Sequence, residues 1–184
     1  FKGTKHTPTL LAAPDIASKL ITCVAATKTF NLAGAHVGAV VTSNRQMKEK
    51  IDARIAAAGL ASFNLFGMIA TEAAWRTGED WLDALLPYLA ANAAHFDQRV
   101  EAAAPGARSM RMDATYLAWV NFSGTGLSEQ DTADRVAQKA RIYVNAGPQF
   151  GPGGTGFLRF NLATPRSILD EALDRLDEAF ADLR

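Results

Sequence analysis

The sequence predicts an α/β sheet fragment, then a helical region, then a mixed α+β unit. Three observations predict this order. Two short apolar runs, at 20–25 and 38–42, have the composition of buried strands. Helical periodicity follows, and the last third of the chain alternates strand and helix patterns. We therefore expect a sheet remnant at 1–44, helices at 45–103 and an α+β unit at 104–184.

The N-terminal elements follow from apolar runs and from the residues between them. Residues 1–14 are polar and interrupted by proline, which predicts a loop. The run from Leu20 to Ala25 predicts a fully buried strand, and Cys23 within it is expected to be a buried, unreactive thiol. Because a second strand pattern follows so closely, at 38–42, the pair indicates the edge of an α/β sheet.

Three helices are expected in the middle of the chain. The first is amphipathic from about Asn44, and Gly59 is expected to end it. Ser62 is expected to N-cap the second helix, which Gly78 ends. The third covers about 79–100.

The last third predicts strands that alternate with helices. Strands are expected at 116–120, 142–144 and 157–162. Helices are expected to start at Ser128, a typical N-cap residue, and at Pro165. The alternation predicts an α+β unit.

Composition excludes several classes of function. Among 184 residues, 48% are hydrophobic, which allows a sizeable core. The 19 basic and 19 acidic residues cancel, so the chain lacks the positive charge that binds nucleic acid. The single cysteine excludes an internal disulfide, and no apolar run is long enough to span a bilayer. We expect a cytoplasmic protein with no nucleic-acid, membrane or metal partner.

Lys28 directly follows the first apolar run. A lysine beside a buried strand must extend to water, pair with an anion or lose its charge. A Schiff base between its amine and an aldehyde is one solution, and it creates a reactive electrophile. The alternative is a lysine at a strand end with its ammonium group in water.

Arg159 lies within an apolar strand pattern. A guanidinium there requires a planar anion, and a carboxylate fits it in a bidentate manner. The anion is either a substrate carboxylate or an acidic side chain of the protein. The glycine-rich segment 151–156 before it is not a phosphate-binding loop, since it lacks the Lys-Ser/Thr ending and leads into a strand. It is expected to be a connector with tight backbone geometry.

Two segments resemble a known family. The run Thr-Lys-Thr-Phe-Asn at 27–31, followed by small residues, resembles the lysine segment of pyridoxal-phosphate (PLP) enzymes of aminotransferase class I/II. It is most similar to the branch of cystathionine β-lyase and related C–S lyases. Gly-Phe-Leu-Arg at 156–159, with Thr-Pro-Arg at 164–166, resembles the family's segment for the substrate α-carboxylate. Further matches lie at 75–82, 86–92 and 113–119.

The resemblance implies roles for individual residues. Lys28 binds PLP covalently and moves protons at the substrate's α carbon. Thr27 contributes a hydroxyl to the cofactor, and Arg159 binds the substrate carboxylate. Ala25 and His36 depart from the better-known members, where a serine and an arginine bind the phosphate. The C–S lyase branch commonly lacks that arginine, so His36 favours this branch and is itself expected to be structural.

The resemblance also implies an architecture. Residues 1–44 correspond to the end of the large PLP-binding domain, 45–103 to the interdomain helices and 104–184 to the small domain. The family's residues for the pyridine ring have no matching position here. We therefore expect the 184-residue chain alone to be inactive or nearly so.

Three functions are considered. The first is a PLP-dependent C–S β-lyase that releases thiol, pyruvate and ammonia from cystathionine or a related cysteine conjugate. The second is an aminotransferase that moves an amino group between an amino acid and an oxo acid. The third is a non-catalytic helical interaction module. The family resemblance favours the two enzymes, with an amino acid as small-molecule substrate and a homodimer as the assembly.

Overall fold

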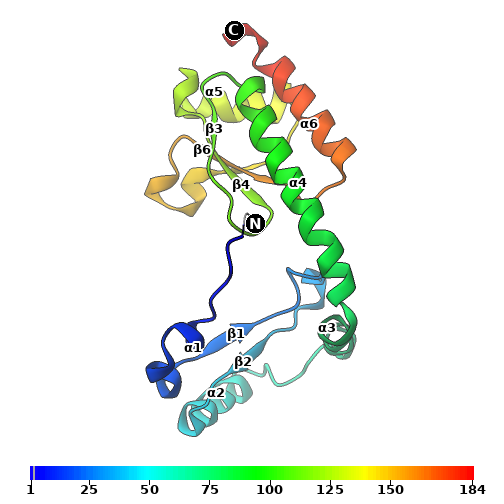
Figure 1. Cartoon of the computed structure of the whole chain (residues 1–184). Helices are drawn as coiled ribbons and strands as arrows, with labels where there is room; N and C mark the ends of the chain where they lie inside the picture. The colour runs from blue at the N-terminus through cyan, green and yellow to red at the C-terminus, as the bar shows by residue number, and fades with distance from the viewer. Residues whose placement is uncertain (2) are drawn as a thin grey trace. The chain divides into compact units, whose positions relative to one another are not determined.

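The computed structural model describes Phe1 and residues 3–184 (Figure 1). These residues form two compact units, and each is described by itself. The N-terminal unit is Lys5–Leu85, and the C-terminal unit is Leu86–Arg184 together with the start of the chain. No helix in the described part of the chain is both long and apolar enough to cross a membrane.

The N-terminal unit contains a small β-ribbon and helices. Its main elements are α1 Thr9–Ala12, β1 Thr22–Val24, β2 Ala39–Val41, α2 Arg45–Ala57 and α3 Leu65–Thr77. The strands β1 and β2 pair in antiparallel fashion, with Cys23 opposite Val40. Their pairing confirms that the two apolar runs are neighbouring strands. The loop predicted over 1–14 is wrong at one point, because residues 9–12 form a single helical turn.

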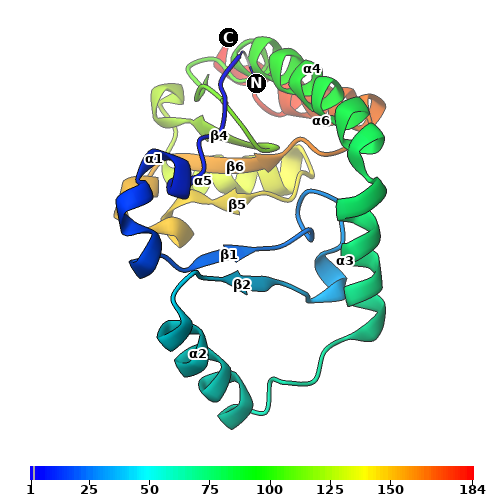
Figure 2. The same cartoon turned by 60° about the horizontal axis from the view of Figure 1, so that its bottom comes forward.

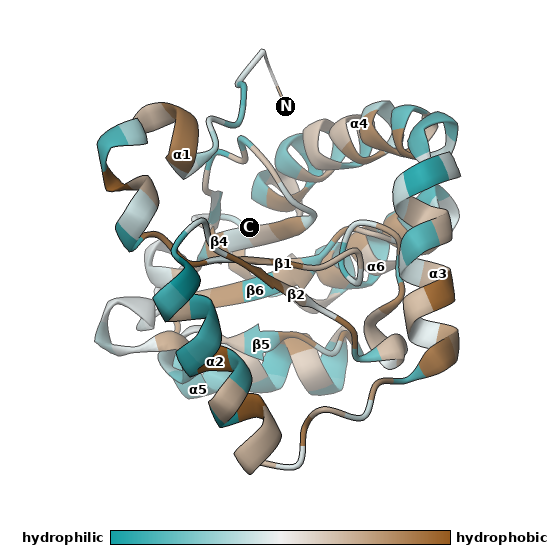
Figure 3. Cartoon of the chain, turned by 90° about the horizontal axis from the view of Figure 1, so that it is seen from below, coloured by the Kyte–Doolittle hydropathy of each residue, from teal (hydrophilic) through white to brown (hydrophobic). Residues whose placement is uncertain are grey.

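The predicted burial of β1 is wrong. All three residues of β1 are exposed, Cys23 is an exposed thiol, and Val40 and Val41 of β2 are exposed as well. Figure 3 shows hydrophobic residues along both strands and along α3. A strand is buried only when a second layer covers its face, and a two-stranded ribbon of three residues per strand has no such layer within the N-terminal unit.

Asparagines begin both helices of this unit. Asn44 caps α2 by accepting the Met47 N–H at 3.1 Å. The α3 cap is Asn64, which accepts the Gly67 N–H at 3.2 Å, so the prediction of Ser62 is wrong. Asn64 lies immediately before the first helical residue, where a side-chain oxygen reaches an unpaired backbone N–H. Gly59, with φ +68°, follows the end of α2 as predicted.

The C-terminal unit combines an antiparallel sheet with helices. The strands are β3 Arg108–Ser109, β4 Leu117–Asn121, β5 Asn145–Ala146 and β6 Phe157–Asn161, and their order is β3-β4-β6-β5. The helices are α4 Glu79–Ala103, most of which lies in this unit, α5 Glu129–Asp134 and α6 Arg166–Ala179. Within this unit α4 and α6 lie side by side against the sheet (Figure 2). The Arg99–Asp174 ion pair at 2.7 Å joins them.

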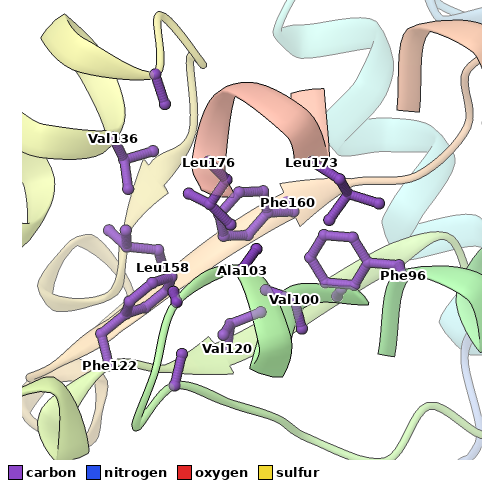
Figure 4. Close-up of a cluster of buried hydrophobic side chains, with 14 of the residues drawn as sticks. Phe96, Val100, Ala103, Val120, Phe122, Val136, Leu158, Phe160, Leu173 and Leu176 are labelled. Carbon is purple, nitrogen blue, oxygen red and sulfur yellow. The ribbon is translucent and has the colours of Figure 1, made fainter. Parts of the chain in front are cut away.

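The sheet has two different faces. Along β4 and β6 buried and partly exposed residues alternate, as expected when one face packs on a core. The inward side chains meet helix residues in one apolar cluster (Figure 4). Its largest members include Phe96, Val100, Val120, Phe122, Leu158, Phe160, Leu173 and Leu176. The opposite face, with Trp119 and Arg159, is left partly exposed.

Three of the predicted starts and strands hold in this unit, and one does not. Ser128 caps α5 by accepting the Asp131 N–H at 3.0 Å, and the strands predicted near 116–120 and 157–162 are β4 and β6. The strand predicted at 142–144 is wrong. Arg141 has φ +54° and turns the chain, Tyr143 is 98% exposed, and pairing with β6 starts only at Asn145.

Candidate functional site

Lys28 lies in a hydrogen-bonded turn that directly follows β1. The turn is closed by the Phe30 N–H, which donates to Ala26 O at 3.0 Å, and by the Leu32 N–H, which donates to Thr27 O at 2.8 Å. Asn31 has φ +54°, a conformation that asparagine adopts more readily than most residues. We call residues 26–32 the lysine turn. It holds the backbone of Lys28 in one conformation, although the residue is outside any helix or strand.

The Lys28 side chain is exposed. Its amine makes no hydrogen bond or ion pair with any residue that the structure describes. Thr27 is half-buried, and its hydroxyl is likewise unused within the described residues. The expectation of a costly buried lysine is therefore wrong for this chain, because β1 beside it is exposed. An accessible amine fits both alternatives, so the covalent role of Lys28 stays a prediction.

An aromatic contact anchors the lysine turn. The rings of Phe30 and Trp81 lie 5.6 Å apart between centroids. A Cβ at position 78 would lie 2.4 Å from a ring carbon of Phe30, so glycine is required there. The sequence identified Gly78 only as the end of a helix, and the end is confirmed. The structure adds that Gly78 leaves room for the ring beside Lys28.

The segment after the lysine turn is attached to α3. Asn64 Nδ2 donates to Ala35 O at 3.2 Å, and a Cβ on Gly67 would lie 2.6 Å from the same oxygen. His36, with φ +51°, ends the short helical turn at 33–35, and its side chain is exposed. These contacts support a backbone role for His36, as the sequence predicted.

Arg159 lies on the open face of the sheet, in β6. Its Nη2 donates to Asn145 Oδ1 at 2.8 Å, and its Cζ lies 4.4 Å from the centroid of the Phe150 ring. The Nε atom is buried and has no hydrogen-bond partner. Within the described residues no acidic side chain pairs with this guanidinium. The alternative of a structural ion pair therefore finds no support, and a planar anion is the ligand that this group lacks.

Aromatic rings surround Arg159. Trp119 lies opposite it across the β4–β6 pair. The indole stacks on Phe157 at 5.2 Å between centroids and meets Phe150 edge-on at 5.6 Å. Sequence reasoning missed Trp119, Phe150 and Asn145 as neighbours of this arginine. Alternation along β4 was the one available signal, since it places Trp119 on the face opposite the core.

Two residues near the candidate segments serve the backbone or the core. The Tyr116 carbonyl accepts the Leu162 N–H at 2.8 Å. Arg166 Nε donates to Oδ1 of the fully buried Asn92 at 2.9 Å, which supports the structural role expected for this arginine.

The glycine-rich segment folds back on itself. A Cβ on Gly147 would lie 1.9 Å from Gly154 O, and a Cβ on Gly154 would lie 2.0 Å from Gly147 O. Neither position accepts a side chain, and both glycines are buried. Tight backbone geometry was the expected use of these glycines. The contact also places Phe150, between them in the chain, against Arg159.

Comparison with known proteins gives consistent matches. The sequence matches the family described as aminotransferase class I and II over residues 2–176. It is similar to cystathionine beta-lyase PatB of Bacillus subtilis, with 35% identity over 97% of this chain and 46% of that protein. It is also similar to an aspartate aminotransferase of Pyrococcus horikoshii, with 26% identity over 97% of this chain and 45% of that protein.

A solved structure matches as well. The crystal structure of cystalysin from Treponema denticola, which contains a pyridoxal 5'-phosphate cofactor, superposes with a TM-score of 0.91 and 31% identity. The match covers 99% of this chain and 46% of that chain. The chain thus spans about half the length of the curated relatives it matches.

Proposed function

This chain belongs to the aminotransferase class I and II family, and we propose that it is part of a PLP-dependent C–S β-lyase. The substrate is a cysteine conjugate such as cystathionine, and the products are a thiol, pyruvate and ammonia. The observation that carries the proposal is the Arg159 guanidinium, which has a buried Nε without a partner and no acidic neighbour among the described residues. Such a group suits the α-carboxylate of an amino acid.

The residues present fit the cofactor. An exposed primary amine without an ionic partner, as at Lys28, can condense with an aldehyde. Thr27 has a hydroxyl available to a phosphate oxygen or another polar atom of the cofactor. Lys28 and Thr27 would therefore hold PLP. When bound, PLP supplies an electron sink that stabilises negative charge at the substrate's α carbon.

Each residue then has a defined task. Arg159 binds the substrate α-carboxylate in a bidentate manner and so orients the α carbon. The Lys28 amine takes the α proton as a general base. The electrons left at the α carbon form a double bond to the β carbon as the C–S bond breaks, and the thiolate leaves. The unsaturated amino acid that remains is hydrolysed to pyruvate and ammonia.

The aminotransferase is the second candidate, because similarity to an aspartate aminotransferase favours it. It would share the proton abstraction by Lys28 and the carboxylate contact of Arg159. The proton would then return to the cofactor carbon, and an oxo acid would leave. Membership of this family favours both enzymes over a non-catalytic helical interaction module.

The three expected regions are kept as part of this proposal. Residues 1–44 would end the large PLP-binding domain, 45–103 would form the interdomain helices and 104–184 the small domain. The formation of separate compact units, with the change from one to the other inside α4, supports an interdomain role for that helix.

The proposed assembly is a cytoplasmic homodimer with a small-molecule amino-acid substrate and no nucleic-acid or membrane partner. Exposed apolar side chains between 60 and 69, among them Phe66 at 81% exposure, support association. The free Cys23 thiol is in keeping with a reducing compartment. Sedimentation of the full-length polypeptide should give twice the monomer mass, and a monomer at micromolar concentration would contradict the dimer.

The test uses the full-length polypeptide with PLP and L-cystathionine. We expect pyruvate and free thiol, with the cofactor unchanged after turnover. Accumulation of pyridoxamine cofactor without thiol would establish the aminotransferase instead. Lys28→Ala should lower kcat by roughly 10²- to 10⁴-fold, as for loss of a general base. Arg159→Lys should raise KM about 10- to 100-fold, as for loss of a charged hydrogen bond.

The controls are exposed residues of the same type. Lys19→Ala and Arg108→Lys should leave both constants within about twofold, since both side chains face solvent. Equal effects of Lys19→Ala and Lys28→Ala would contradict the assigned role of the lysine. The 184-residue chain by itself should show little or no turnover, and a rate like that of the full-length polypeptide would contradict this expectation.

A further inference from the structure

We propose that Asn145 is a positioning residue that orients Arg159 toward the substrate carboxylate without neutralising its positive charge. The inference rests on the proposed function, in which Arg159 binds that carboxylate. Asn145 touches neither substrate nor cofactor in this proposal. It acts through the arginine and so sets the affinity for ligands that carry a carboxylate.

The backbone places Asn145 and Arg159 together. Asn145 begins β5, and its Cα is the register partner of Arg159 in the antiparallel β5–β6 pair. Cross-strand partners lie close enough for their side chains to interact directly. The result is the contact from Nη2 to Asn145 Oδ1 at 2.8 Å. The sheet register therefore sets this contact, independently of any ligand.

The amide of Asn145 is oriented by a second residue. Its Nδ2 lies 3.4 Å from Gln149 Oε1, so the nitrogen faces a glutamine acceptor and the oxygen faces the arginine. A carboxylate at this position could not donate to Gln149. The pattern of one donor and one acceptor thus selects an amide at position 145.

Phe150 restrains the guanidinium from its face. The Cζ of Arg159 lies 4.4 Å from the ring centroid, within the range of a cation–π contact. Asn145 uses one of the five N–H donors of the guanidinium, and the buried Nε–H has no partner. With one donor used and one face covered, the plane of the group is set while donors remain for an incoming anion.

The choice of amide over carboxylate determines the charge. A neutral acceptor leaves the full positive charge of Arg159 for the ligand, whereas an aspartate at the same distance would form an ion pair with it. That ion pair would compete with the substrate carboxylate. Asn145→Asp should therefore strengthen the contact inside the protein and weaken the binding of carboxylate ligands.

The experiment compares two ligands that differ only in the carboxylate. L-Alanine and ethylamine carry the same amine on the same carbon skeleton, and neither has a thiol leaving group. Their binding to the full-length PLP-loaded polypeptide is read from the absorption of the bound cofactor, which requires no turnover. We expect Asn145→Asp to weaken L-alanine binding about 10- to 100-fold and to leave ethylamine within about twofold.

A second variant separates positioning from packing. Asn145→Ala should weaken L-alanine binding less than Asn145→Asp does, about three- to tenfold. The order of melting temperatures should be the opposite, with Asn145→Asp at least as stable as Asn145→Ala, since the carboxylate pairs with Arg159. A purely structural role would put both measurements in the same order. Asn121→Asp, which adds the same charge to the same sheet face, should change neither ligand's affinity by more than about twofold.

The outcomes that overturn the inference are distinct. If Asn145→Asp binds L-alanine as tightly as the unaltered protein, or loses both ligands equally, Asn145 does not tune the charge of Arg159. Arg159→Lys tests the underlying function separately. If this variant leaves the ratio of L-alanine to ethylamine affinity unchanged, Arg159 does not bind the carboxylate, and both proposals fail. If Asn145→Asp does not fold, Asn145→Ala carries the test with the same ligand pair.

Discussion

Single residues without large side chains determine how both candidate segments are held. Gly78 leaves the space that Phe30 occupies at the lysine turn. Gly147 and Gly154 allow a backbone contact that places Phe150 under Arg159. In each case a missing Cβ, rather than an added interaction, permits the geometry. Such positions are recognised only when the neighbouring atoms are known.

Gly78→Ala tests this at the lysine turn. The added Cβ would come within 2.4 Å of the Phe30 ring, and the backbone at Gly78 has a φ of −88°, which alanine adopts without strain. We therefore expect a loss of about 1–3 kcal/mol from overpacking alone, measured by urea unfolding of the full-length polypeptide. Gly34→Ala is the matched control, because nothing lies within 4 Å of its added Cβ. Equal losses for the two variants would contradict a specific role of Gly78.

Secondary-structure elements in this chain start at side-chain caps. Asn44, Asn64 and Ser128 each accept a backbone N–H from the first turn of α2, α3 and α5. Each cap satisfies a donor that has no partner inside the helix. Asn64 also holds Ala35, so the start of α3 is coupled to the segment behind the lysine turn.

Asn64→Ala should cost about 1 kcal/mol of unfolding free energy, the usual cost of losing a cap. Ser62→Ala, the change at the residue that the sequence pointed to, should stay within about 0.5 kcal/mol because Ser62 is exposed and caps nothing. Denaturant unfolding of both variants measures the difference. A larger loss for Ser62→Ala would show that the helix starts earlier than described.

At the scale of the whole molecule, the apolar core and the exposed apolar surface lie in different units. Every fully packed member of the core cluster falls between Ala93 and Phe180. The N-terminal unit instead exposes large apolar residues such as Phe63, Phe66 and Ile69. The predicted aminotransferase fold is confirmed by the superposition on cystalysin, which covers 46% of that chain. The two units should therefore differ in autonomous stability.

We expect a polypeptide of residues 86–184 to unfold cooperatively on heating, and one of residues 5–85 to lack a cooperative transition. The first contains the core, and burial of apolar area is the dominant stabilising term. Circular dichroism melting curves measure both. Phe96→Ala in the first polypeptide should cost about 3–5 kcal/mol, as for other buried aromatic residues. A cooperative transition in 5–85 alone would refute the assignment of stability to the core cluster.

Local patterns were sufficient for part of the fold and of the site. The strands at β4 and β6, the end of α2 at Gly59 and the cap at Ser128 each depend on residues adjacent in the chain. Lys28 and Arg159 stood out for the same reason, as charged residues next to apolar runs. Their roles remain predictions that the proposed variants test.

Other features depended on partners distant in sequence. The run at 20–25 is apolar enough for a buried strand, yet burial requires a covering layer that composition does not report. The segment 142–144 has strand composition, but the backbone turn at Arg141 delays pairing until Asn145.

By itself the sequence determined the family, the two charged candidate residues and most element positions, because short-range periodicity and motif spacing suffice for these. Only the tertiary structure decided which side chains surround Arg159 and that its positive charge has no acidic partner among the described residues. The physical reason is that cross-strand register brings Asn145, Trp119 and Arg159 together from three separate strands. Register is a property of paired backbones, and no single segment of the chain encodes it alone.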